Sequence, residues 1–214
     1  MKANNNQSFN GIAELSHLAS EWMSMLENWC PDDWTEMLPT LDLEQPDRHL
    51  SAKSLPVLSF LSQMEVQAPL TYQSFVKRLN RIQADLHFNQ TYSVEDFGSE
   101  FLQQYGWIKF LGPDAYWHSD QLSSGFVLPG DNTTYPQHWH AAEELYFPIS
   151  GAGDWYHENY GWQTKSPGDR IVHASNVKHS MRTNGQPLLL LYIWRGKDLA
   201  QKSELHKTQA LSPG

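Results

Sequence analysis

The spacing of hydrophobic residues changes near residue 106, and this change constrains the fold more than any other feature of the chain. Before it, apolar residues recur at intervals of three and four, as on one face of an amphipathic helix. After it, short apolar or alternating segments are separated by Gly, Pro, Asn and Asp, which is typical of short strands joined by turns. We therefore expect an α-helical N-terminal extension over residues 1–105, a β-rich unit over residues 106–196, and a peripheral tail over residues 197–214.

The two patterns predict individual elements. The helical spacing indicates four helices, over residues 11–29, 54–64, 72–87 and 93–105. The second pattern indicates six strands, near residues 107–111, 124–128, 145–149, 154–157, 170–172 and 188–194. Many short strands at this spacing favour a small sandwich or barrel, so the predicted fold class is mainly β with helices ahead of it. A chain of 214 residues is long enough for one such domain with a substantial core.

Charge and composition narrow the class of partner. The chain carries 24 acidic and 15 basic residues, a net charge of -9, and no basic patch, so we expect no nucleic-acid partner. Nine Trp, nine Tyr and nine Phe, combined with that negative charge, are compatible with a small cationic ligand. Most of these aromatic residues are nevertheless expected to fill the core.

The redox state and the location are predicted from absences in the sequence. Cys30 is the single cysteine, so no intramolecular disulfide can form, and a free buried thiol is expected. The N-terminal residues lack the apolar run of a signal peptide, and no apolar segment approaches membrane-spanning length. We expect no membrane partner and a cytoplasmic location.

Four potential metal ligands stand in the β-rich half. His138, His140 and Glu144 are close in sequence, and His179 is distant. Because side chains alternate along a strand, His138 and His140 can share a face while Trp139 points away. Three nitrogens and one carboxylate oxygen suit a divalent transition metal with open coordination positions. Fe, Mn, Zn, Ni and Co all accept such ligands, so the sequence does not select among them.

The residues around these ligands are assigned by the same alternation. A strand that starts at Glu144 sends Tyr146 to the same face and Glu143 to the other. No spacing rule adds His157 or His173 to the ligand set, and structural or solvent-exposed roles are expected for both.

At this point the sequence resembles the two motifs of the cupin superfamily. The first motif runs Gly130…His138-x-His140-x3-Glu144-x6-Gly151, and the second runs Gly161-x5-Pro167-Gly-Asp…His179…Asn184. The spacer ahead of His138 is longer than usual, and the interval from His179 to Asn184 is one residue longer, but neither departure touches a ligand. The resemblance implies a single-domain cupin, a small β-barrel or jelly roll, with one divalent metal bound by the four residues.

A closer resemblance is to the bacterial cupin dimethylsulfoniopropionate (DMSP) lyases. It rests on the helical extension, on Tyr135 five residues ahead of His140, on Tyr146 two after Glu144, and on Trp194 fifteen after His179. Enzymes of that family split this zwitterion into dimethyl sulfide and acrylate with a divalent metal. The resemblance therefore implies a carbon–sulfur lyase that acts on a small zwitterionic substrate.

The chemistry of β-elimination gives these residues expected roles. Tyr146 is the first choice of base, because a dication nearby favours the tyrosinate although the free pKa is about 10. Tyr135 is the second choice, either as the base or as a hydroxyl that orients the substrate carboxylate. A sulfonium has no hydrogen-bond donor, so aromatic faces are its natural partners. The candidates for this wall are Trp194 first, followed by Trp155, Tyr156 and Trp117.

Two other functions remain open from the sequence. The same ligands serve cupin dioxygenases and isomerases that act on other small carboxylates, and a non-catalytic cupin could sense or store a small molecule. The helical extension either lids the barrel or forms a homodimer interface, and nothing in its pattern separates these arrangements.

Overall fold

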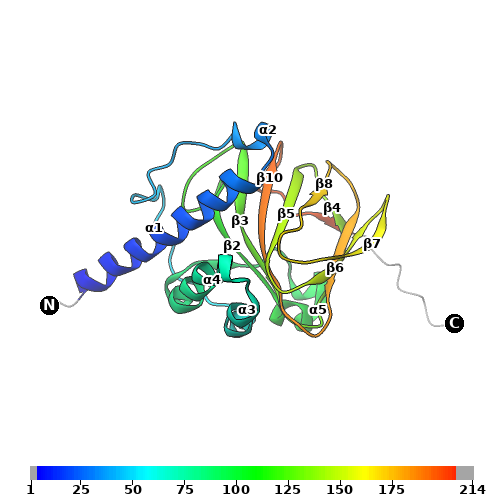
Figure 1. The fold of residues 1–214 in the computed structure, drawn as a ribbon, viewed down its shortest axis with the longest axis horizontal. Helices are drawn as coiled ribbons and strands as arrows, with labels where there is room; N and C mark the ends of the chain where they lie inside the picture. Colours follow the sequence, from blue (N-terminus) through cyan, green and yellow to red (C-terminus); the bar gives the residue numbers. More distant parts are fainter. Residues whose placement is uncertain (1–3, 206–214) are drawn as a thin grey trace.

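The computed structural model describes residues 4–205, with side chains from residue 13 onward. Its first, third and fourth helices lie on one side of the molecule and most of its strands on the other, whereas its fifth helix lies at the lower edge of the strands (Figure 1). The helices are α1 (Asn4–Trp29), α2 (Asp32–Thr35), α3 (Leu61–Gln67), α4 (Leu70–Ile82) and α5 (Val94–Gln103), with short 3₁₀ helices at Pro56–Phe60 and Gln83–Asp85. None of the described helices combines the length and the apolar character needed to cross a bilayer.

The four predicted helices are all present, with shifted ends. The helix α1 begins earlier than expected, and the segment predicted over 72–87 forms α4 followed by a 3₁₀ turn. Ser93 caps α5: its backbone N–H donates to Asp96 Oδ2 at 2.8 Å, within a full capping box.

Eleven strands are described, and they form two antiparallel sheets. Their bounds are β1 (Phe88–Asn89), β2 (Tyr105–Leu111), β3 (Leu122–Pro129), β4 (Thr134–Trp139), β5 (Glu143–Ser150), β6 (Gly153–His157), β7 (Gly161–Lys165), β8 (Ile171–His173), β9 (His179–Thr183), β10 (Leu189–Arg195) and β11 (Glu204–Leu205). One sheet has the order β1-β2-β3-β10-β5-β8 and the other β11-β4-β9-β6-β7. The six predicted strands are confirmed, whereas β1, β4, β7, β9 and β11 were not predicted.

The six-stranded sheet is buried on both faces. In β10, Leu189, Leu191 and Ile193 point into one hydrophobic cluster, while Leu190 and Tyr192 point into another. The first cluster lies between this sheet and the helices α1, α3 and α4, which cover its outer face (Figure 1). The second fills the space between the two sheets. Alternation along one strand therefore serves two cores at once.

Two short strands lie wholly outside residues 106–196, where the β-rich unit was expected. The short strand β1 joins the six-stranded sheet from within residues 1–105, and β11 pairs with β4 from within the predicted tail. Cys30, at the end of α1, is buried as expected, and burial raises the pKa of its thiol to about 12. At neutral pH the thiol is therefore protonated and a poor nucleophile.

Candidate active site

The four predicted ligands converge between the two sheets. Glu144 comes from β5 of the six-stranded sheet, whereas His138 in β4, His140 directly after it, and His179 in β9 come from the other sheet. His138 and His179 lie opposite each other in the β4–β9 register. All four side chains are buried, and Glu144 is fully so. A polar cluster with this degree of burial requires partners that compensate for lost water.

The three histidines are held in one tautomer by the backbone. In His138, His140 and His179, Nδ1 lies 2.8–2.9 Å from a carbonyl oxygen two residues away in sequence. Because Nδ1–H donates to that carbonyl, the lone pair of Nε2 is free, which is the usual arrangement of a metal-binding histidine. The Nε2 atoms of His140 and His179 are buried and have no hydrogen-bond partner.

The distances around Glu144 fit a bound divalent ion. Oε2 of Glu144 lies 3.3 Å from Nε2 of His140 and 3.4 Å from Nε2 of His179. Ligands at about 2.0–2.1 Å from a tetrahedral metal are separated from one another by about 3.3–3.4 Å. The ligand atoms of His138, His140 and His179 also lie within 4.8 Å of one another. The donor set that the sequence predicted is therefore assembled and could hold a metal.

The charge states also suit metal ligands. Burial lowers the pKa of His138 to about 4 and holds that of His179 well below its ordinary value, so both rings are neutral. Burial opposes ionisation of Glu144, but His140 and the other adjacent histidines hold its pKa well below the usual range. The Glu144 carboxylate and the neutral rings of His138 and His179 are in the protonation states in which these groups bind cations. Burial opposes the charged form of His140, but Glu144 raises the pKa of this histidine, which would release its proton on binding an ion.

His173 belongs to the same cluster, and the sequence did not indicate this. It lies on β8 opposite Glu144, and the ligand atoms of Glu144, His173 and His179 form a second group within 4.8 Å. A strand through residues 171–173 sends Ile171 and His173 to the same face, and this is the signal that was available. His157, in contrast, is partly exposed and stacks on Tyr160 with ring centroids 4.6 Å apart.

The two predicted catalytic tyrosines both face the interior. Tyr146 is 5% exposed, and Tyr135, also 5% exposed, stacks on His138 at 4.1 Å between ring centroids. The hydroxyl oxygens of Tyr135 and Tyr92 are 2.6 Å apart. Burial raises the pKa of Tyr146 well above its ordinary value, and the charge of Glu144 adds to this. A tyrosinate at this position therefore requires a cation beside it.

A cavity of about 340 Å³ opens onto these groups. Its inner wall includes Glu144, Tyr135 and Tyr146, and five consecutive residues of the C-terminal segment, 199–203, lie along it. Tyr105, Tyr192 and Trp194 add further aromatic surface. The cavity walls combine these aromatic rings with polar and charged side chains, and a volume of this size is typical of a small-molecule site.

One of the four predicted substrate-wall residues, Trp194, lies in the wall of this cavity. Its ring centroid is 4.2 Å from that of His140, and its indole N–H donates to Oε1 of Glu144. The structure thus gives Trp194 a contact with a predicted ligand that the sequence did not indicate.

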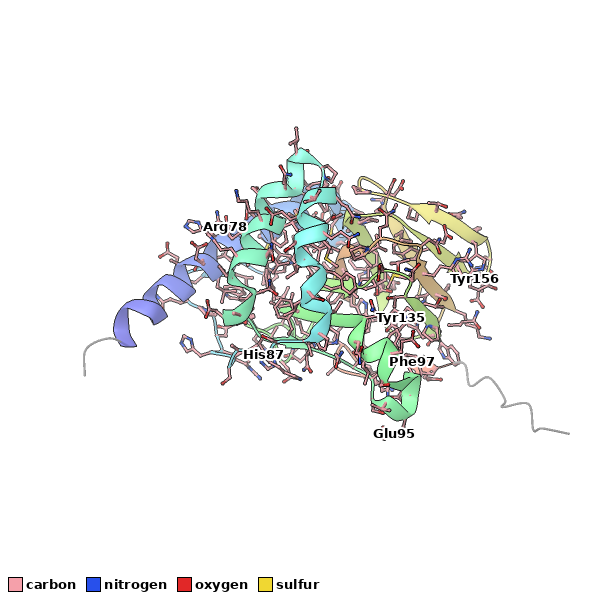
Figure 2. All side chains as sticks on the ribbon, turned by 90° about the horizontal axis from the view of Figure 1, so that it is seen from below. Arg78, His87, Glu95, Phe97, Tyr135 and Tyr156 are labelled. Carbon is pink, nitrogen blue, oxygen red and sulfur yellow. The ribbon has the colours of Figure 1, made fainter. Side chains whose placement is uncertain are left out.

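The other three aromatic residues lie away from the cavity. Trp155 is buried in the cluster between the sheets but does not line the cavity. Tyr156 packs against Trp162 at 5.5 Å between ring centroids, and Figure 2 places it at the edge of the molecule, apart from Tyr135. Trp117 belongs to the helix-covered core, where its indole donates to the Asp42 carbonyl at 2.9 Å. The structure therefore does not bring these three residues into the wall of the cavity.

With this geometry in place, the comparisons with known proteins are decisive for the family. The family model described as dimethylsulfoniopropionate lyase matches residues 34–190. The chain belongs to the DMSP lyase family. The matched residues include the four predicted ligands, Tyr135 and Tyr146, and they end before Trp194.

Two curated relatives agree with this assignment. Dimethylsulfoniopropionate lyase DddQ of Ruegeria pomeroyi is 31% identical over 106 residues, which cover 50% of this chain and 53% of that protein. The putative dimethylsulfoniopropionate lyase DddL of Cereibacter sphaeroides is 33% identical over 109 residues, 50% of this chain and 45% of that protein. The matched part thus spans about half the length of each relative.

Solved structures agree on the fold. The crystal structure of DMSP lyase DddQ from Ruegeria pomeroyi matches with a TM-score of 0.78 and 23% identity, over 90% of this chain and 96% of that one. A chain from the crystal structures of the DMSP lyases RdDddP and RnDddQII matches with a TM-score of 0.76 and 23% identity, over 92% and 98%. The predicted cupin fold with its helical extension is confirmed.

Proposed function

We propose that this protein is a lyase that cleaves DMSP to dimethyl sulfide and acrylate by β-elimination. The observation that carries the proposal is the convergence of Glu144, Tyr146 and Trp194 on one cavity, beside three buried histidines. Membership of the DMSP lyase family and the names of the two curated relatives support the same substrate.

The reaction breaks one C–H bond and one C–S bond. A base removes a proton from the carbon next to the carboxylate, the electron pair forms the C=C bond, and dimethyl sulfide leaves with the electrons of the C–S bond. The products are dimethyl sulfide, acrylate and one proton. A divalent ion held by His138, His140, Glu144 and His179 would supply positive charge that stabilises the carboxylate as the proton leaves.

The two tyrosines take different parts in this proposal. The Oη atom of Tyr146 accepts the α-proton, because Tyr146 shares the inner face of β5 with Glu144 and lines the cavity. Tyr135 is fixed between the His138 ring and the Tyr92 hydroxyl, so its hydroxyl is suited to orient the substrate carboxylate. Precise orientation of this kind accounts for a large part of the rate in such sites.

We assign the sulfonium group of the substrate to the aromatic residues that line the cavity. Trp194 and the neighbouring rings of Tyr105 and Tyr192 line the cavity. A cation over such a ring gains about 0.5–2 kcal/mol. The net charge of -9 adds a field that favours a positively charged group.

A headspace assay tests the proposal. Purified, metal-loaded protein incubated with DMSP should release dimethyl sulfide and acrylate in equal amounts, and a chelator should abolish the release. Absence of both products from metal-loaded protein would contradict the proposal. Oxygen consumption during turnover would instead indicate a dioxygenase, and recovery of bound substrate unchanged would indicate a binding protein.

A further inference from the structure

His173 touches the predicted metal site, but neither the cupin motifs nor the proposed reaction uses it. It lies on β8, at the edge of the six-stranded sheet, and its side chain is fully buried. In the β5–β8 register it stands opposite Glu144. A buried imidazole is costly unless its ring nitrogens are used, so its contacts show what it does there.

Three contacts connect His173 with functional residues. Its Nδ1 lies 3.0 Å from Oε2 of Glu144. Its ring stacks on that of His179, with centroids 3.8 Å apart and planes at 15°. Its ring also meets Tyr146 edge-on at 5.9 Å between centroids. One side chain therefore contacts two predicted ligands, which come from different sheets, and the predicted base.

Hydrogen bonds from His173 and Trp194 fix the orientation of the Glu144 carboxylate. The Trp194 indole N–H donates to Oε1, and His173 Nδ1–H donates to Oε2. An ionised carboxylate oxygen has two lone pairs, so Oε2 can accept this bond and still face His140 and His179. Donors arranged in this way around a ligand orient it and raise metal affinity.

We propose that His173 is a positioning residue of the metal site. Its Nδ1–H holds the Glu144 carboxylate in the orientation that binds the ion, and its ring holds the plane of His179. The inference rests on the metal site of the proposed function but not on the identity of the substrate.

A direct metal bond from His173 is the competing arrangement. Its Nε2 is buried and has no hydrogen-bond partner, and His173 belongs to the second group of potential ligand atoms with Glu144 and His179. The two arrangements differ in which ring nitrogen is needed. Positioning needs a donor at Nδ1, whereas a metal bond needs a lone pair.

Two amide substitutions separate these roles. In His173→Asn the amide nitrogen takes the place of Nδ1, and in His173→Gln it takes the place of Nε2. The affinity for Co²⁺ is measured by competition with a chromophoric chelator, and the visible spectrum of the Co²⁺ complex reports the coordination. His157→Gln is the control, because this histidine lies on β6 of the other sheet, its ring is 6.0 Å from that of His173 between centroids, and it belongs to neither group of potential ligand atoms.

We expect His173→Gln to bind Co²⁺ about 10–100-fold more weakly, His173→Asn to stay close to the unsubstituted protein, and His157→Gln to change nothing. Unaltered affinity in His173→Gln would overturn the proposal. So would equal loss in both amide variants with an altered Co²⁺ spectrum, because that result indicates a direct ligand.

A third variant keeps the test decisive if the amides do not fold. His173→Phe preserves the stacked ring and removes only the donor, so it should fold and should lose affinity as His173→Gln does. Full Co²⁺ affinity in His173→Phe would overturn the proposal. All of these measurements omit substrate, so a failure of the lyase assay would leave their result unchanged.

Discussion

Tyr146 shows how one residue can depend on its neighbours for its chemistry. It is buried two residues beyond Glu144, and both burial and that carboxylate raise its pKa. The phenol is therefore neutral without a cation, although the predicted base must lose its proton. A divalent ion held by the proposed histidine and carboxylate ligands would supply the missing charge.

Tyr146→Phe should abolish release of dimethyl sulfide while metal content stays near normal. A general base contributes about 10²–10⁴-fold to a rate, and the substitution removes only the hydroxyl. Headspace dimethyl sulfide and metal analysis of the purified variant measure the two effects. Tyr156→Phe, which alters a tyrosine away from the cavity, should keep full activity. Glu144→Ala or His179→Ala should instead lower metal occupancy. Most of the activity remaining in Tyr146→Phe would remove this residue as the base.

At the scale of elements, ion pairs join the helix α1 to α4. Oε2 of Glu14 in α1 lies 2.7 Å from Nη1 of Arg78 and 2.5 Å from Nη2 of Arg81. Two turns further along α1, Glu21 accepts a hydrogen bond from Ser74 at 3.0 Å. Arg78 and Arg81 of α4 thus hold α1 in place over the sheet.

Glu14→Gln should remove the ion pairs with Arg78 and Arg81, and its effect on stability should depend on pH. The hydrogen bond from Arg78 is the largest cause that lowers the pKa of Glu14 below its ordinary value of 4.5. A lowered pKa in the folded state contributes stability above pH 4.5, and this contribution is lost as the pH falls through the folded-state pKa.

Urea unfolding measures the effect of Glu14→Gln. At neutral pH the free energy of unfolding should fall by about 0.5–1 kcal/mol, because the pair is partly exposed. The difference from the unsubstituted protein should vanish well below pH 4.5. Glu27→Gln, on the exposed side of the same helix, is the control. A difference that persists unchanged in acid would show that charge is not its cause.

At the scale of the whole molecule, the helices and the six-stranded sheet share one hydrophobic core. Trp22 of α1 is fully buried, and its indole donates to Ser124 of β3 at 3.1 Å. Its ring meets Phe110 of β2 edge-on at 5.4 Å between centroids. Because the helices cover the outer face of the six-stranded sheet, either part alone would expose a large apolar surface (Figure 1).

Trp22→Leu should lower the free energy of unfolding by about 2–4 kcal/mol, because it leaves a cavity and removes the indole N–H that donates to Ser124. Unfolding followed by far-UV circular dichroism and by tryptophan fluorescence should show one transition, and its midpoint should shift by the same amount with both probes. Trp162→Leu, at a site that is 45% exposed, should change little. Two separate transitions would contradict a shared core.

The sequence by itself determined the features that depend on neighbours along the chain. Periodicity separated the helical half from the β-rich half, and alternation along strands placed His138 with His140 and Glu144 with Tyr146. The strand β7 was missed because its edge position leaves polar residues such as Gln163 and Thr164 exposed. The strands β4 and β9 were missed because their functional and polar residues interrupt the apolar pattern.

Tertiary structure alone decided which distant residues meet. His173 contacts Glu144 because β8 pairs with β5 in one particular register, and no local pattern specifies that register. Trp117 and Trp194 are both aromatic residues of the β-rich half, but one packs under the helices and the other lines the cavity. Both faces of the six-stranded sheet are apolar. The sequence therefore shows that a residue is buried, but not whether it faces the helices or the second sheet. The pairing of strands decides which face a residue occupies, and therefore which residues form the site.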